Sequence, residues 1–445
     1  MGDSSLSVKP KIAFIGMSHL GLVSSIVGAS KGFQIICYDN CPKKISRLSD
    51  GDLGINEPKL FDYLIKSKNN IKWSNNLQDI VQCKIIYLSI DIKTDSNGKS
   101  DLSEINDYLS KLDKILKNDN ELVILSQVNP GFTRNVRVKA KNIYYQVETL
   151  VFGNAIDRAL NPERITIGLK EKDRNLSKNF KVFLDSFKCP LIIMNYESAE
   201  LTKISINLFL IAQVSVTNTV SSLCEKIGAD WTDMVPSLKL DKRIGQYCYL
   251  KPGLGISGGN LERDMATIME ISSYKQIDNS LINTFIQNSH DRKKWVFENL
   301  KSVYPDLNKK LKISILGLSY KENTDSVKNS PSIETIKLIP NVSIYAYDPV
   351  VKWNVKWHNN ATILNNLYDT LNDCDAMLIM TPWEEFKTIN LKKVKKLMKG
   401  RLIIDPYCML LNDKNVHRDF KYIYMGGSQN NKDLKNGNKL TKKLT

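Results

Sequence analysis

Two short segments near opposite ends of the chain read almost alike. Residues 11–18 are KIAFIGMS, and residues 312–319 are KISILGLS. Each is an apolar run that ends at a glycine, which is typical of a buried parallel strand before a tight turn. Each is followed by a second apolar run that ends in Tyr-Asp, at Asp39 and at Asp348. Strand, turn, helix and strand with a terminal acid form a βαβ unit, so the sequence predicts an α/β protein with two Rossmann-like domains.

The other apolar segments predict how the chain is divided into domains. Residues 197–228 have an apolar stripe and no proline, which predicts a long central helix joining the two domains. We therefore expect a first domain over residues 1–195, a helical domain over 196–305 and a second Rossmann-like domain over 306–425. Residues 426–445 are rich in Gly, Asn and Lys, which predicts a disordered tail. Further strands are expected at 84–90, 122–126, 164–168, 191–194, 376–380 and 402–404.

The composition of the chain argues against a nucleic-acid partner, a metal site and a membrane segment. The 63 basic and 47 acidic residues give a net charge of +16, but no nucleic-acid recognition motif accompanies it, so we expect no nucleic-acid partner. The eight cysteines form no CxxC pair and only four histidines are present, so no metal site is expected. The longest apolar stretch, 204–216, is interrupted by polar residues, and residues 1–11 lack a signal-peptide core. We expect a cytoplasmic protein without a membrane segment.

The first βαβ unit carries a dinucleotide fingerprint, Gly16-Met17-Ser18-His19-Leu20-Gly21. Gly16 allows the tight turn, and Gly21 lets helix and strand pack closely. Ser18 stands at the second glycine position, where its hydroxyl can donate to a phosphate oxygen. Asp39 is placed to accept hydrogen bonds from a ribose 2′-OH, which favours NAD over NADP. A Rossmann domain that binds no dinucleotide is the alternative at this stage.

Several further segments, taken in order over residues 10–415, resemble the UDP-glucose/GDP-mannose dehydrogenase family. They are Gly51-Asp52-Leu53-Gly54-Ile55-Asn56-Glu57-Pro58, Ser126-Gln127-Val128-Asn129-Pro130-Gly131, ETLVFGNA at 148–155, Ala199-Glu200-Leu201-Thr202-Lys203 with Asn207, Asp241-Lys242-Arg243-Ile244-Gly245, and Gly317-Leu318-Ser319-Tyr320-Lys321. No single match is decisive, but six in order are specific.

The resemblance implies an NAD-dependent enzyme of polysaccharide biosynthesis that oxidises a sugar's primary alcohol. It implies a UDP-linked sugar held by the second Rossmann-like domain, and a homodimer formed through the helical middle. By the same resemblance, the catalytic residues are Lys203, Asn207, Asp264, Glu148 and Asn260, and we expect Asn260 to donate its NH₂ group to a substrate oxygen. The cofactor also contacts Ser126, and the substrate contacts Arg243, Gly255, Gly258 and Lys321.

One departure from the family pattern bears on the chemistry. The family's loop reads Gly-Phe-Gly-Gly-x-Cys-x-x-Lys-Asp, whereas residues 255–264 read GISGGNLERD, which puts Asn260 at the position of the cysteine. In the family this cysteine forms the thioester that completes a four-electron oxidation, and an amide is no nucleophile at neutral pH. We expect either one two-electron oxidation, at C6 or a ring carbon, or oxidation of a hydrated aldehyde without a thioester. Cys248 is an alternative nucleophile.

Two other function classes stay open at this stage. One is a catalytically silent nucleotide-sugar-binding protein, which would not require Lys203, Asn207 and Asp264. The other is a basic nucleic-acid-binding Rossmann protein. The identity of the sugar stays open, because further positions differ from the family pattern. They are Gln127, Lys328, Asn329, DPYC at 405–408, and Asp91 with Ile92.

Overall fold

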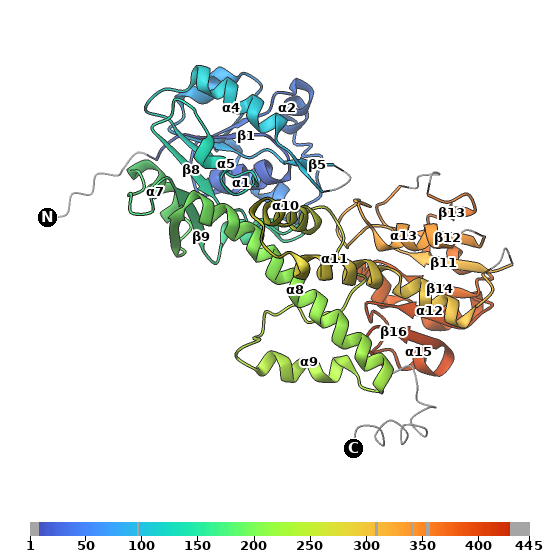
Figure 1. The fold of residues 1–445 in the computed structure, drawn as a ribbon. Coiled ribbons are helices and arrows are strands. Elements are labelled where there is room, and N and C mark those ends of the chain that lie inside the picture. The colour runs from blue at the N-terminus through green and yellow to red at the C-terminus, as the bar shows by residue number, and fades with distance from the viewer. Residues whose placement is uncertain (1–8, 96–97, 308–309, 340, 353–356, 428–445) are drawn as a thin grey trace. The chain divides into compact units, whose positions relative to one another are not determined.

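The computed structural model describes residues 9–95, 98–307, 310–339, 341–352 and 357–427. The chain divides into two compact units, residues 1–206 and 207–445, each built around a mainly parallel sheet with helices (Figure 1). This confirms the α/β prediction with two Rossmann-like domains. Residues 428–445 of the predicted disordered tail lie outside the described residues.

The first unit holds an eight-stranded sheet in the order β10-β9-β8-β7-β4-β1-β2-β3. All neighbouring pairs are parallel except β8 and β9. Its strands are β1 (Ile12–Ile15), β2 (Ile35–Tyr38), β3 (Ile71–Ser74), β4 (Ile85–Leu88), β7 (Glu121–Ile124), β8 (Asn142–Gln146), β9 (Ile165–Leu169) and β10 (Leu191–Asn195), with a separate antiparallel pair of β5 (Lys93–Thr94) and β6 (Ser100–Asp101).

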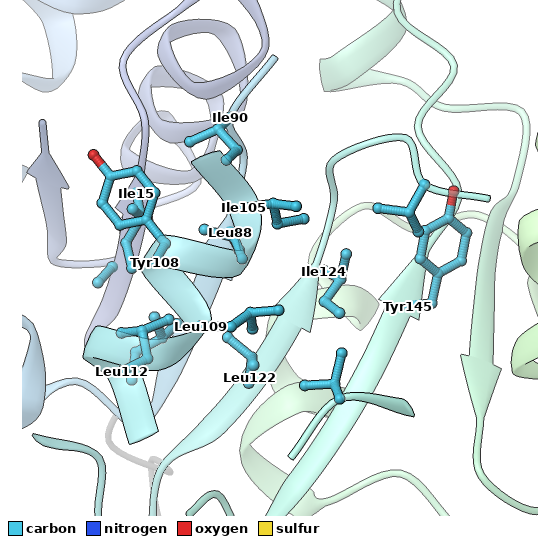
Figure 2. Close-up of a cluster of buried hydrophobic side chains, with 14 of the residues drawn as sticks. Ile15, Leu88, Ile90, Ile105, Tyr108, Leu109, Leu112, Leu122, Ile124 and Tyr145 are labelled. Atoms are coloured by element: carbon cyan, nitrogen blue, oxygen red, sulfur yellow. The ribbon is translucent and has the colours of Figure 1, made fainter. Parts of the chain in front are cut away.

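Helices cover this sheet because its central strands are apolar on both faces. Every residue of β1, β2, β4 and β7 is buried. Figure 2 shows Ile105, Tyr108, Leu109 and Leu112 in one cluster with side chains of the neighbouring strands. The helices of this unit are α1 (His19–Ser30), α2 (Pro42–Ser49), α3 (Leu60–Ser67), α4 (Ser103–Ile115), α5 (Phe132–Asn135), α6 (Ala155–Leu160) and α7 (Lys178–Asp185), with 3₁₀ turns at Lys68–Asn70 and Leu77–Gln82.

The second unit holds a six-stranded parallel sheet in the order β13-β12-β11-β14-β15-β16. Its strands are β11 (Lys312–Leu316), β12 (Ser343–Tyr347), β13 (Ala361–Ile363), β14 (Ala376–Ile379), β15 (Leu402–Asp405) and β16 (Lys421–Tyr424). Its helices are α9 (Trp231–Leu240), α10 (Asn260–Lys275), α11 (Ser280–Lys293), α12 (Trp295–Val303), α13 (Pro331–Leu338), α14 (Leu391–Leu397) and α15 (Lys414–Asp419), with 3₁₀ turns at Leu367–Leu371 and Glu384–Thr388.

Helix α8 (Tyr196–Ile227) runs without a break from the first unit into the second, as the sequence predicts. Among the described residues, it is the one helix that is long and apolar enough to cross a bilayer, with a mean hydropathy of 1.3 over its most apolar stretch. A third of that stretch is buried inside the protein. Core helices of water-soluble proteins have the same length and composition, so this finding alone assigns no membrane segment.

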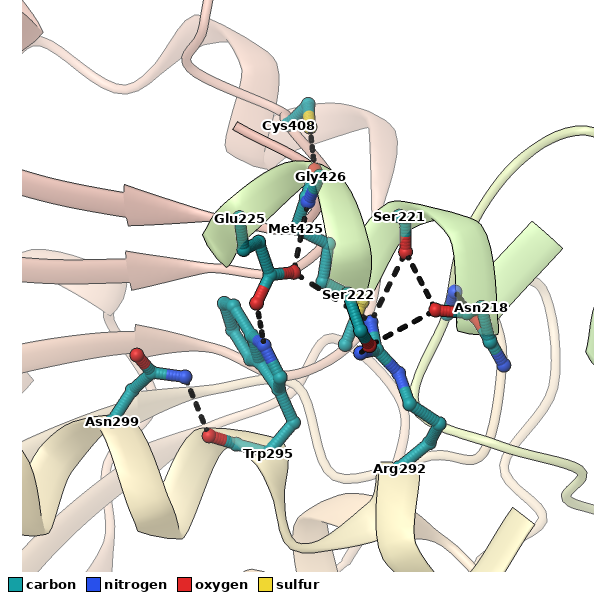
Figure 3. A network of polar contacts seen from close by, with 11 residues as sticks. Asn218, Ser221, Ser222, Glu225, Arg292, Trp295, Asn299, Cys408, Met425 and Gly426 are labelled. Atoms are coloured by element: carbon teal, nitrogen blue, oxygen red, sulfur yellow. Dashed lines mark hydrogen bonds and ion pairs between the residues drawn. The ribbon is translucent and has the colours of Figure 1, made fainter. Parts of the chain in front are cut away.

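A buried polar network fastens the end of α8 within the second unit (Figure 3). Glu225 on α8 accepts hydrogen bonds from the Trp295 indole at 3.0 Å and from the Gly426 amide at 3.0 Å. Arg292 on α11 donates to the hydroxyl of Ser222, and its guanidinium lies 3.9 Å from Glu225. The network therefore joins α8 to α11, to α12 and to the chain that follows β16.

The first turn of α1 has no room for a side chain at Gly21. A Cβ there would lie 1.8 Å from the Gly16 carbonyl oxygen, which is backbone and cannot rotate away. We expect Gly21→Ala to lower the free energy of unfolding by about 1–3 kcal/mol, the usual cost of overpacking. Calorimetric unfolding measures this. Gly28→Ala on the same helix is the matched control, because its Cβ would meet only side-chain atoms, those of Ile35 at 3.3 Å, Phe183 at 3.6 Å and Phe14 at 3.8 Å. This variant should leave stability equal or slightly higher, since alanine favours the helix. Equal stability of both variants would contradict the prediction.

Candidate active site

The turn between β1 and α1 has the shape that a dinucleotide needs. Gly16 has a φ of +93°, and a Cβ there would lie 2.4 Å from the Ile90 side chain. Ser18 caps α1, and its hydroxyl is buried without a hydrogen-bond partner among the described residues. An unpartnered hydroxyl at a helix N-terminus is ready to donate to a phosphate oxygen. These residues fit the pyrophosphate of NAD.

Asp39 follows β2 and is 6% exposed. Its Oδ2 accepts a hydrogen bond from the Met17 amide at 3.0 Å and pairs with Lys44 at 2.8 Å. Its Oδ1 accepts a bond from the Cys41 amide at 3.1 Å. A carboxylate oxygen has two lone pairs, so Oδ1 retains acceptor capacity for a ribose hydroxyl. The position predicted for cofactor recognition therefore keeps that capacity in the folded protein.

The equivalent acid of the second sheet, Asp348, differs from Asp39 in the number of hydrogen bonds that it accepts. Asp348 follows β12, and its Oδ2 accepts hydrogen bonds from Leu318, from both the amide and the hydroxyl of Ser319, and from the Trp383 indole. Two further amides donate to its Oδ1. With every lone pair engaged, this acid holds its own turn together and has none left for a ribose. The two similar sequence units therefore differ in the acceptor capacity that this acid retains.

Ser126 lies two residues after the end of β7 and is fully buried. Its hydroxyl donates to the carbonyl oxygens of Leu88 at 3.2 Å and Ile90 at 2.7 Å. The side chain therefore fixes the start of the loop 126–131 to the neighbouring strand. The expected contact of Ser126 with the cofactor stays a prediction.

Two residues that the sequence analysis did not assign a role link the cofactor turn to the segment 148–155. His19, at the start of α1, contacts Glu57 at 2.8 Å, and its ring lies 4.1 Å from that of Phe152. The Glu57 carboxylate also accepts the amides of Gly153 at 3.0 Å and Ala155 at 2.8 Å. Glu57 stands in the quoted segment 51–58, but its partners are about 100 residues away, so no local pattern identifies them.

Glu148 and Lys203 form an ion pair inside the first unit. The Lys203 ammonium lies 3.6 Å from Glu148 Oε2, and both side chains are largely buried. The Leu150 amide donates to the other carboxylate oxygen. Burial raises the pKa of Glu148, while the positive charges of Lys203 and His19 oppose that rise. A buried lysine–carboxylate pair of this kind can take up and pass on the proton of an alcohol.

Asn207 and Asp264 meet inside the second unit. The Asn207 amide donates to Asp264 Oδ2, and Arg263 lies 3.3 Å from Oδ1. Asp264 is 2% exposed. Lys203 and Asn207 lie one turn apart on α8, so they share a face of that helix. The structure thus brings Asn207 and Asp264 together, and Lys203 and Glu148 together, as two pairs.

The glycine-rich loop before α10 is held on both sides. A Cβ on Gly255, whose φ is +77°, would lie 2.4 Å from the Ser289 carbonyl oxygen. A Cβ on Gly258, whose φ is +84°, would lie 2.9 Å from the Tyr320 ring. Both positions therefore require glycine. Asn260, the first residue of α10, is exposed and stands at the end of this constrained loop.

The other predicted substrate residues lie in the second unit. Arg243 is 89% exposed at its side chain and pairs with Asp241 at 2.6 Å. The Lys321 ammonium lies 5.8 Å from the centre of the Tyr320 ring. These two side chains do not fix a ligand position by themselves.

A cavity of about 540 Å³ beside the end of β15 was not anticipated from the sequence. Three aromatic residues, Trp231, Tyr249 and Tyr407, line it together with Lys239 and Lys251. The Lys251 ammonium lies 5.9 Å from the centre of the Tyr407 ring. Aromatic walls with two cations suit a flat, anionic ligand such as a nucleotide. Cys248 also lines this cavity.

Metal-binding residues do not cluster in the part of the chain that the structure describes. No group of three or more His, Cys, Asp or Glu side chains there has the geometry to hold an ion.

Comparison with known protein families matches three segments of the chain to three domains of one family. Residues 10–184 match the NAD-binding domain of the UDP-glucose/GDP-mannose dehydrogenase family, residues 197–290 its central domain, and residues 314–412 its UDP-binding domain.

Full-length relatives agree with this assignment. The UDP-glucose 6-dehydrogenase of Rickettsia conorii is 30% identical, over 93% of this chain and 99% of the relative. That of Rickettsia prowazekii is 31% identical, over 94% and 99%. A solved UDP-glucose dehydrogenase from Pyrobaculum islandicum has the same fold, with a TM-score of 0.82, 21% identity, and coverage of 95% of this chain and 98% of that one. The chain belongs to the UDP-glucose/GDP-mannose dehydrogenase family.

Proposed function

We propose that this NAD-dependent nucleotide-sugar dehydrogenase oxidises an alcohol of a UDP-linked sugar by two electrons, without a covalent thioester step. The pair Lys203–Glu148, together with the pair Asn207–Asp264, is the observation that carries the alcohol oxidation. A protein that only bound a nucleotide sugar would have no need for a buried lysine–carboxylate pair, whose desolvation is unfavourable.

Oxidation of an alcohol removes a proton and a hydride, and bound NAD supplies the hydride acceptor. The Lys203–Glu148 pair receives the hydroxyl proton, because a carboxylate with a raised pKa is a better base than an exposed one. Asn207, held by Asp264, orients its amide toward an oxygen of the sugar. Lys203 and Asn207 project from the same face of α8, one turn apart.

Asn260 sets where the reaction ends. A thiolate in its place would add to the aldehyde and carry the acyl group through a second oxidation. The carboxamide of Asn260 has no such reactivity, so the aldehyde, or its hydrate, leaves the enzyme. Cys248 lines the cavity beside β15 and remains the alternative nucleophile.

The UDP group of the substrate is assigned to the second unit. The UDP-binding family domain over residues 314–412 supports this assignment. We place the nucleotide at the cavity beside β15, with Gly255, Gly258 and Lys321 along the adjoining loops. The lysines of the cavity supply charge for the diphosphate, and its aromatic residues supply a stacking surface for the base.

An apolar stripe on α8 supports a homodimer. Phe209, Val216, Leu223 and Ile227 recur at intervals of seven, seven and four residues, and are 72%, 61%, 54% and 63% exposed. Such spacing puts them on one side of a helix, as in helix–helix interfaces. We propose that a second copy of the chain covers this stripe, and that the enzyme works as a cytoplasmic dimer.

The function is tested by NADH formation from a panel of UDP-, GDP-, TDP- and CDP-sugars. We expect a UDP-sugar to give NADH, and Lys203→Ala to lower kcat by about 10²–10⁴-fold, the usual contribution of an acid–base group. Binding of UDP, measured by calorimetry, should stay within twofold of the unmodified protein. If the unmodified protein binds a UDP-sugar but forms no NADH from any sugar in the panel, the result would instead support a nucleotide-sugar-binding protein without catalytic activity.

Restoring the sulfur tests the role assigned to Asn260. We expect Asn260→Cys to form a covalent adduct with the sugar aldehyde, visible by mass spectrometry of the intact protein. The thiol lies at the N-terminus of α10, where the helix dipole favours its thiolate form. Asn260→Ser is the control, because it is equally small but a poor nucleophile without a base. Absence of an adduct in the cysteine variant would contradict the assignment of this position.

The dimer is tested at Leu223. We expect Leu223→Lys to convert the protein to a monomer in light scattering, because it places a charge in the middle of the apolar stripe. Lys226→Ala, an exposed change on the same turn, should leave the dimer intact. A dimer that survives Leu223→Lys would place the interface elsewhere.

A further inference from the structure

One buried acid of the first unit has no part in the chemistry proposed above. Glu200, in the second turn of α8, is fully buried. Its Oε2 accepts a hydrogen bond from the Gly131 amide at 2.5 Å, and its Oε1 accepts one from the Thr133 amide at 2.8 Å. Both carboxylate oxygens are therefore occupied by the backbone of one short segment, 131–133, some 70 residues earlier in the chain.

A second contact holds the neighbouring residue to the same helix. Arg134 donates to both carboxylate oxygens of Glu197, at 2.5 Å and 2.8 Å. Its guanidinium also lies 5.3 Å from the centre of the Tyr196 ring. This contact is half-exposed and joins two side chains, whereas Glu200 binds backbone amides in the interior.

The segment that Glu200 holds ends the loop 126–131 after β7. In a parallel α/β sheet, a dinucleotide lies over the carboxyl ends of the strands, and this loop leaves one of those ends. Ser126 fixes the beginning of the loop to β4, and Glu200 fixes its end to α8. The loop therefore has one anchor on the sheet and one on the helix.

Glu200 also lies one turn before Lys203 on the same helix, so the two side chains share a face of α8. Lys203 meets Glu148 at 3.6 Å. The rigid helical turn between Glu200 and Lys203 thus connects the backbone of the loop 126–131 to the ammonium group assigned to the proton transfer.

We propose that Glu200 is a positioning residue, which locks the cofactor-side loop 126–131 to helix α8 and so fixes Lys203 relative to the bound cofactor. The inference rests on the proposed function, because it gives Lys203 and the cofactor their roles there. A carboxylate suits this position because it offers an acceptor to each of two N–H donors, whereas an amide offers an acceptor to one and an opposing N–H to the other.

The test uses Glu200→Gln in the full-length protein, with Glu197→Gln as the matched control. We expect Glu200→Gln to lower kcat by about tenfold or more, since misplacement of a reacting group by an ångström has effects of that order. Its Kd for NAD, measured by calorimetry, should rise by about threefold or more. Amide exchange at Gly131 and Thr133 should accelerate. The Kd for UDP should not change, and Glu197→Gln should keep kcat and the NAD Kd within twofold.

Equal kcat and NAD Kd in the two variants, with only a lower unfolding temperature for Glu200→Gln, would overturn the proposal. If Glu200→Gln does not fold, Glu200→Asp serves instead, because it keeps the charge and loses reach to one amide. An unchanged NAD Kd and unchanged amide exchange in that variant also overturn it. If the unmodified protein reduces no NAD with any sugar, the proposed function fails, and the NAD Kd and amide exchange still decide the role of Glu200.

Discussion

Helix α8 is the constraint on which the site depends. It is one unbroken helix of 32 residues, and it carries Glu200, Lys203, Asn207 and the apolar stripe that starts at Phe209. Because an α-helix fixes the spacing of its side chains, each of these groups constrains the others. Glu200 and Lys203 make their contacts within the first unit, and Asn207 makes its contact within the second.

The acids that follow the second strand of each sheet have similar sequence surroundings but different hydrogen-bond partners. Both units begin with an apolar strand, a glycine turn and a helix, and both place an acid after the second strand. Asp39 accepts three bonds and retains room for another, while Asp348 accepts six. Asp348 accepts four backbone amides where Asp39 accepts two, and the Ser319 hydroxyl and the Trp383 indole donate to it where Asp39 has only the Lys44 ammonium. The short sequence motif fixes the position of the acid. The residues that contact it in the folded protein determine how many of its lone pairs stay available for a ligand.

Much of the fold could be predicted because its signals are local. Apolar runs ending at Gly16 and Gly317 marked both sheets, and the apolar stripe of 197–228 marked α8 within one residue at each end. The family resemblance placed Asn207 and Asp264 among the catalytic residues, and the structure shows these two side chains in contact. The links of Glu57 and Glu200 to distant backbone amides could not be predicted, because a backbone amide has no sequence signature. The cavity beside β15 could not be predicted for a different reason: its walls come from segments that are far apart in the sequence.

In the proposed reaction, Asn260 ends the oxidation after one hydride transfer. The most direct test counts NADH by absorbance, and the product mass by mass spectrometry, in one reaction with a UDP-sugar. We expect one NADH per sugar and a product about 2 Da lighter than the substrate, because a dehydrogenation removes two hydrogens and the amide of Asn260 cannot hold the aldehyde covalently. Two NADH per sugar and a product about 14 Da heavier, the mass change of an acid, would contradict it, since a carboxylate would then form without the thioester.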